Sequence, residues 1–170
     1  MEYLYSLALR LGAAFVVLFI GQDVLYKLLF WPMFYISYLL LLPFKPVISG
    51  NTLLINNIGL VFVSACVGAS AYVLLTLLVL LTKDVMLRRG IKILVTGFIA
   101  LFIVNIIRIY FLAFILIKFD FKLFETLHLF FWQVLSTLFV FVLWIFITKY
   151  YKVTTIPFFS DFKYLLKKFR

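Results

Sequence analysis

Charged residues are scarce in this sequence: they make up 13% of its 170 residues, whereas 67% are hydrophobic. Soluble domains carry about a quarter charged residues, and a chain of this length cannot bury so large an apolar surplus in a soluble core. Disordered proteins lack large apolar side chains, yet this chain has 22 phenylalanines. The composition therefore excludes a soluble or a disordered protein and indicates an integral membrane protein.

Acidic residues and cysteine are also scarce. There are 6 Asp and Glu against 16 Lys and Arg, which gives a net charge of +10. The basic residues gather in short clusters beside apolar runs, a pattern that orients membrane proteins, so we do not expect nucleic-acid binding. The single cysteine excludes an intramolecular disulfide.

Five apolar runs are long enough to cross about 30 Å of hydrocarbon. They cover residues 4–20, 24–42, 58–82, 91–117 and 127–148. The first two fit two spans, or one long helix with a short re-entrant segment. We therefore expect an all-α, polytopic membrane bundle of about five transmembrane helices, with four to six possible, in one domain over residues 1–148.

Lysine and arginine in the short loops predict the orientation. The loop after residue 82 and the tail after residue 148 are the most basic, so both are expected in the cytoplasm. Segments 43–57 and 118–126 are then external. The tail, residues 149–170, has phenylalanine and leucine among its lysines, which fits an amphipathic stretch on an anionic leaflet or a partly disordered basic end. We expect a plasma-membrane protein with a cytoplasmic carboxyl terminus.

Three reactive side chains are expected at one depth. Counted from the basic end of its own helix, Cys66 lies 17 residues away, Arg108 lies 16 and His128 lies 21. At about 1.5 Å per residue, these counts correspond to roughly 24 to 31 Å. The only cysteine, the only histidine and the only arginine of the last three runs are therefore expected near the external face.

Each of these residues also has an ordinary structural interpretation. A free cysteine in an apolar run is usually packed among other apolar side chains. A histidine at the start of a helix can lie partly solvated at the membrane interface. An arginine inside a span costs at least about 2.5 kcal/mol and normally faces a partner or a cavity. Structural pairing would use the nearest acids, which are Asp120, Glu125 and Asp23.

Chemistry offers a joint explanation for the three residues. A buried thiol is a poor nucleophile, but a neighbouring imidazole can take its proton. A fixed guanidinium can stabilise the thiolate or the oxyanion of a tetrahedral intermediate, and the imidazole can then protonate the leaving amine. Cys66, Arg108 and His128 are therefore sufficient for acyl transfer from a peptide bond.

The neighbours of the three residues fit this hypothesis. Asn105 shares a helical face with Arg108 and is expected to hold the guanidinium. Trp132 and Ser136 lie on one stripe with His128, although Trp132 also fits an interfacial anchor. Small residues around the cysteine allow close helix approach; they are Ala65, Gly68, Ala69 and Ala71.

Three motifs, in their order along the chain, resemble those of the exosortase/archaeosortase family of membrane cysteine transpeptidases. The sequence of the first motif is most similar to that of compact archaeal members. The three motifs are SACVGASAY at residues 64–72, NIIR at 105–108 and LHLFFW at 127–132. The resemblance covers roughly residues 50–148. One departure is Val67, which replaces the usual serine between the cysteine and the glycine.

The resemblance implies a cysteine peptidase that cleaves secreted proteins at a carboxy-terminal motif followed by a transmembrane helix and a basic cluster. The new carboxyl end would pass through a thioester to a lipid or another amine acceptor. Cys66 would be the nucleophile, Arg108 the electrostatic group and His128 the acid and base, near the external face. Supporting positions would be Asn105, Gly68, Ser70 and Trp132. No metal or organic cofactor is implied.

Two other functions fit the sequence. A non-enzymatic membrane subunit or carrier could bind an anionic lipid or solute through Arg108. A family member without activity could serve as a scaffold. Under the first of these hypotheses, replacing Cys66 by alanine would have no functional effect, whereas Arg108→Gln would lose the ligand.

Overall fold

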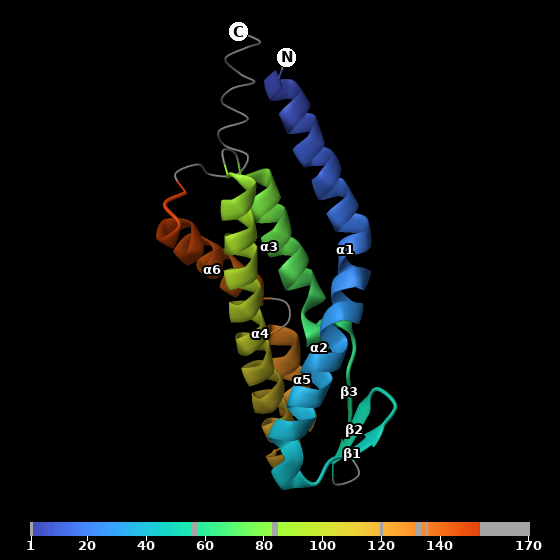
Figure 1. Cartoon of the computed structure of the whole chain (residues 1–170). Helices are drawn as coiled ribbons and strands as arrows, with labels where there is room; N and C mark the ends of the chain where they lie inside the picture. The colour runs from blue at the N-terminus through green and yellow to red at the C-terminus, as the bar shows by residue number, and fades with distance from the viewer. Residues whose placement is uncertain are drawn as a thin grey trace.

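The structure is a computed structural model that describes residues 2–55, 58–82, 85–119, 121–131, 134 and 136–153 (Figure 1). Helices dominate these residues, and a small sheet interrupts them. The elements, in chain order, are α1 (Glu2–Leu41), η1 (Leu42–Phe44), β1 (Val47–Ser49), β2 (Thr52–Ile55), β3 (Ile58–Val61), α2 (Ser64–Val67), α3 (Ala69–Leu81), α4 (Leu87–Lys118), α5 (Phe121–Phe130) and α6 (Ser136–Tyr150).

The amino-terminal part is one continuous helix of 40 residues, so the prediction of two spans is wrong. Gly21 lies inside the helix, and a Cβ at this position would lie 3.4 Å from a methyl group of Val73 on α3. A single glycine costs a helix only about 1 kcal/mol, and here the small residue allows the two helices to approach. Pro32 also lies inside α1. The alternative of one long helix is the better description, although no re-entrant segment follows it among the described residues.

The run 58–82 is not one helix, and the all-α prediction is wrong in this region. It starts as strand β3, continues as the one-turn helix α2 and ends as α3. Gly68 separates the two helices with a left-handed φ of 71°, a conformation that glycine adopts without steric cost. Strand β3 completes a three-stranded antiparallel sheet in the order β1–β2–β3. An apolar run by itself does not distinguish a buried strand from a helix.

The run 91–117 lies within α4, as expected, whereas the run 127–148 is shared between α5 and α6, and residues 132, 133 and 135 between them lie outside the described part. Helix α5 already begins in the segment predicted to be an external loop and ends at Phe130, and α6 begins at Ser136. Of the predicted basic tail, only residues up to Val153 are described, and residues 154–170 lie outside the described part.

Two helices in the described part are long and apolar enough to cross a membrane: Leu7–Phe44, which includes η1, and Leu87–Lys118. Helices α3 and α6 are apolar but shorter. Large apolar side chains such as Phe19 and Leu28 stand on the outside of α1, where a membrane would cover them. The chain is therefore mostly helical with two candidate spans, which is a coarser result than the predicted five-helix bundle.

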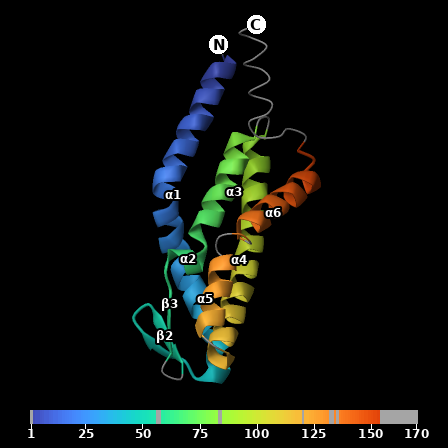
Figure 2. The same cartoon turned by 180° about the vertical axis from the view of Figure 1, so that it is seen from behind.

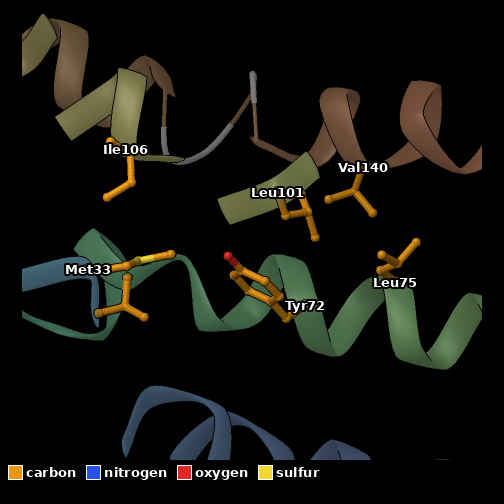
Figure 3. Packing of buried hydrophobic residues seen from close by; sticks show 7 residues of the cluster. Met33, Tyr72, Leu75, Leu101, Ile106 and Val140 are labelled. Atoms are coloured by element: carbon orange, nitrogen blue, oxygen red, sulfur yellow. The ribbon is translucent and has the colours of Figure 1, made fainter. Parts of the chain in front are cut away.

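Helices α1, α3 and α4 run side by side, and the sheet and α5 lie at the end opposite to the amino terminus (Figures 1 and 2). A first cluster of buried side chains joins the three helices to α6 (Figure 3); it consists of Met33, Val67, Tyr72, Leu75, Leu101, Ile106 and Val140. A second cluster ties the sheet to α1 and α4 through residues such as Phe34, Leu53 and Ile109. The short helix α2 lies where the two clusters meet, because Val67 belongs to the first and Cys66 packs against the second.

Candidate functional site

The carboxyl end of α2 is held by two side chains of α4. A helix leaves its last carbonyl groups without intrahelical partners, and α2 is only one turn long. Asn105 and Arg108, three residues apart on α4, point their donors at these carbonyls. The backbone around Cys66 is therefore fixed by bonds to another helix.

Asn105 is buried and uses its side-chain amide on the backbone of α2. Its Nδ2 donates to the carbonyl oxygens of Cys66 at 2.9 Å and Val67 at 2.8 Å, and it also lies 3.1 Å from the sulfur of Met33 on α1. We expected Asn105 to hold the Arg108 guanidinium. Instead, both residues bind the same short helix, because the left-handed turn at Gly68 brings its carbonyls toward α4.

Arg108 is 8% exposed and has backbone oxygens as its main partners. Its Nη2 donates to the carbonyl oxygens of Ala65 at 2.8 Å and Cys66 at 2.9 Å, and Nη1 donates to Ser136 Oγ at 3.3 Å. Its Nε is buried without a partner among the described residues. In this part of the chain, which leaves out Asp120, no carboxylate forms an ion pair with Arg108.

Cys66 lies in α2, outside the two helices of spanning length, and is partly buried. Its thiol donates a weak hydrogen bond to the carbonyl oxygen of Val61 at 3.5 Å. Burial raises the pKa of this thiol, while a hydrogen bond from the Val63 backbone and the positive charge of Arg108 act in the opposite direction. Because the net direction favours the neutral thiol, a base is needed to form the thiolate.

His128 lies on α5, also outside the helices of spanning length. Its ring stacks on Phe124 with centroids 5.6 Å apart and planes inclined by 24°. Burial lowers the pKa of the imidazole, and the charge of Arg108 lowers it further. His128 is therefore neutral near pH 7 and able to accept a proton.

One cavity of about 290 Å³ brings the three side chains together. Strand β3 and the helices α2, α4 and α5 line it. Cys66, Arg108 and His128 all contribute to its wall. Among the described residues no hydrogen bond joins the thiol to the imidazole, and no three His, Cys, Asp or Glu side chains gather into a metal site.

The other predicted positions differ in their relation to this cavity. Gly68 provides the turn after Cys66, and a Cβ there would lie 3.5 Å from Asn105 Oδ1. Ser70 is exposed and lines neither this cavity nor the second one described below. Trp132 lies outside the described residues.

A second cavity, of about 330 Å³, also has Arg108 in its wall and lies between α3, α4 and α6. Tyr72 contributes to its wall; the side chain is 1% exposed, and its hydroxyl oxygen has no hydrogen-bond partner among the described residues. Sequence reasoning did not single out Tyr72, although its place at the end of the cysteine motif was a signal. It noted Ser136 only as part of the His128 stripe, and the structure adds its bond to Arg108.

Comparisons with protein-family models, with curated proteins and with solved structures find no match to this chain. The exosortase/archaeosortase family therefore remains a hypothesis that depends on three short motifs.

Proposed function

We propose that this chain is a membrane-embedded cysteine transpeptidase of the exosortase/archaeosortase type. The observation that carries the proposal is the single cavity shared by Cys66, Arg108 and His128. A nucleophile, a neutral base and a fixed positive charge around one space are the groups that acyl transfer requires. This set comes from three different helices, α2, α4 and α5.

In the proposed reaction His128 takes the thiol proton, and the Cys66 sulfur attacks the carbonyl carbon of a peptide bond. Arg108 stabilises the negative charge on the sulfur and on the carbonyl oxygen, since its Nε–H is unpartnered and its Nη1 has only one long bond. The C–N bond then breaks as His128 protonates the leaving amine, which leaves a thioester on Cys66. An acceptor amine attacks the thioester and restores the thiol.

The proposed reaction requires one rearrangement of the site. The thiol hydrogen now points to the Val61 carbonyl, so the Cys66 side chain has to turn toward the imidazole when substrate binds. Catalytic hydrogen bonds are often absent before substrate binds and form in the complex. The main-chain bonds from Asn105 and Arg108 keep the backbone in place during this rotation.

The proposed substrates are secreted proteins with a carboxy-terminal motif, a transmembrane helix and a basic cluster, and the acceptor is a membrane lipid or another amine. In support, Arg88 and Arg89 begin α4 at the end of the molecule opposite to the sheet and α5 (Figure 1). If basic ends lie in the cytoplasm, the cavity faces the outside, where a secreted chain presents its motif.

The test is intact-mass analysis of the protein purified from cells that also produce secreted proteins from the same source with this carboxy-terminal pattern. We expect a substrate-sized adduct on the wild type that hydroxylamine releases, because hydroxylamine cleaves thioesters. Cys66→Ala should insert normally and carry no adduct. Thr126→Ala, an exposed change on α5, should retain it. An adduct on Cys66→Ala, or none on the wild type, would contradict the proposal.

The second cavity favours one other function, a subunit or carrier that binds an anionic lipid or solute. Arg108 and Tyr72 both line this cavity. Each has a buried donor without a partner among the described residues, the Nε–H of Arg108 and the hydroxyl of Tyr72, and the remaining wall is mostly apolar. Native mass spectrometry of protein extracted with its lipids tests this function. A lipid that Arg108→Gln loses and Cys66→Ala retains, without any thioester adduct on the wild type, would favour it over the transpeptidase.

A further inference from the structure

Within the described part of the chain, strand β3 is an edge of the sheet, and the strand lines the cavity. The strand order is β1–β2–β3, so β2 is paired on both sides and β3 on only one. Residues 58–63, which comprise β3 and the two residues after it, all line the cavity. An edge strand presents unpaired N–H and C=O groups that can pair with another chain.

The register identifies which backbone groups are free. In an antiparallel pair, residues alternate between hydrogen-bonded and non-bonded positions. The Phe62 N–H donates to the Asn51 carbonyl at 2.9 Å, so this pair is a bonded one. Leu60, opposite Leu53, follows the same alternation. Gly59 and Val61 therefore direct their N–H and C=O groups away from β2, toward the free edge.

The cysteine lies at the end of this free edge. The thiol of Cys66 bonds to the Val61 carbonyl, which shows independently that this carbonyl points away from β2. The same cavity is lined by α4 and α5, which contribute Arg108 and His128. The free backbone groups of Gly59 and Val61 and the three reactive side chains thus border one space.

We propose that the free edge of β3 binds the substrate as an extended peptide, which adds a fourth strand to the sheet and brings its scissile carbonyl to Cys66. This inference rests on the proposed function, and it adds how the substrate is held. Backbone bonds to Gly59 and Val61 supply affinity for any extended sequence, and alternate side chains of the peptide fill the cavity. When the peptide binds, the Val61 carbonyl accepts a peptide N–H in place of the thiol, which frees Cys66 to turn toward His128.

The site favours a peptide because the exposed polar groups along β3 are those of the backbone. Such groups need a hydrogen-bond partner when they are covered, and an extended chain offers donors and acceptors at the matching repeat. Gly59 adds no side chain to the strand. A second copy of this chain, paired edge to edge, is the competing occupant, and the experiment separates the two.

Val61→Pro tests the proposal because it removes the N–H at the free edge without removing a bond to β2. Ile48→Pro is the matched control. Ser49 and Thr52 close the two-residue turn between β1 and β2, so Ile48, one position earlier, directs its N–H to the far edge of the sheet. The two side chains are similarly exposed, 48% for Val61 and 44% for Ile48.

The measurement compares the rates at which two reagents label Cys66 in the full chain in membranes. One is a mixture of tetrapeptidyl vinyl sulfones, which carry a peptide backbone; the other is iodoacetamide, which does not. We expect the ratio of the two rates to fall about tenfold in Val61→Pro, as for the loss of a hydrogen bond, and to stay unchanged in Ile48→Pro. Methylation of the backbone amides of the peptide reagents should lower the ratio equally on the wild type.

An unchanged ratio in Val61→Pro, or no effect of methylation, would overturn the proposal. If Val61→Pro had a different oligomeric state from the wild type in native mass spectrometry, the free edge of β3 would instead be an interface between two copies of this chain, and the proposal would be overturned. A failure of the proposed function would give a different result. The wild type would then form no thioester with the co-produced secreted proteins, while the labelling ratio of the peptide reagents would still fall in Val61→Pro.

Discussion

The two sides of the cavity are held in very different ways. On the side of α2 and α4, Asn105 and Arg108 bind three consecutive carbonyl groups, those of Ala65, Cys66 and Val67. On the side of α5, His128 is stacked on Phe124 of its own helix, and its side chain has no hydrogen bond within the described residues. Cys66, the proposed nucleophile, is thus fixed through its backbone, while His128, the proposed base, belongs to a helix with weaker attachments.

This difference separates stability from chemistry. Substitutions of the α4 side chains that bind α2 leave buried carbonyl groups without a hydrogen-bond partner, so they should lower the free energy of unfolding. Changes at His128 remove a group that the fold hardly uses, so they should affect the reaction alone. The predictions below test this separation.

The largest expected effect is on the reaction rate of His128→Ala. General acid–base catalysis contributes about 10²- to 10⁴-fold, so the rate of thioester formation should fall within this range. Because the side chain is half-buried and has no hydrogen bond within the described residues, the free energy of unfolding in detergent should change by no more than about 1 kcal/mol. Thr126→Ala, on the same helix, is the control for both measurements. A stability loss comparable to that of a buried residue would contradict the comparison between the two sides.

The pH profile checks the role of the same imidazole. The pKa of His128 is lowered from its ordinary value of 6.5 by burial and by the charge of Arg108. The neutral imidazole therefore predominates at pH 7 and is protonated only as the pH falls below the ordinary histidine range. In the wild type, the rate of thioester formation should fall as the imidazole is protonated. The residual rate of His128→Ala should not show this decrease at acidic pH.

A smaller effect, on stability, is expected for Asn105→Ala. The substitution removes the donor to the carbonyls of Cys66 and Val67, and an unsatisfied buried acceptor costs about 1 to 3 kcal/mol. We expect a loss of about 2 kcal/mol in the free energy of unfolding, measured by circular dichroism in mixed micelles. Thr76→Val is the control, since Thr76 bonds only to the Tyr72 carbonyl within its own helix. Equal stability of the two variants would show that α4 does not hold α2.

The smallest effect is expected for Ser136→Ala. The serine accepts the longest bond of Arg108, at 3.3 Å, and donates to the Phe131 carbonyl at 2.6 Å. Because the other bonds of Arg108 remain, the loss should be about 1 kcal/mol. The same unfolding assay measures it. A loss larger than that of Asn105→Ala would show that α6, and not α2, is the main partner of the α4 side chains.

Part of the fold could be predicted from the sequence. The run around Arg108 forms one long helix because it is apolar and uninterrupted by proline, and α4 covers it fully. The shared helical face of Asn105 and Arg108 also follows from their spacing. The partners of these side chains could not be predicted, because the carbonyls of α2 become available only through the turn at Gly68.

The predicted run 58–82 shows why apolar composition does not by itself identify an element. An apolar composition indicates that a segment is kept away from water, but both a buried strand and a helix can have such a composition. Strand β3 forms because β2 pairs with it, and β2 is reached through the tight turn at Gly50, whose φ is 59°. Such pairing between segments leaves no periodic signal in either segment alone.

The sequence by itself determined that the protein is apolar and mostly helical, and that its one cysteine and one histidine lie on separate segments from Arg108. These properties follow from composition and spacing along single elements. Only the tertiary structure decided that the three side chains border one cavity, that side chains of α4 form hydrogen bonds to the carbonyl groups of α2, and that the free edge of β3 ends near Cys66. Each of these arrangements depends on hydrogen bonds or packing between residues far apart in the chain, which no local pattern encodes.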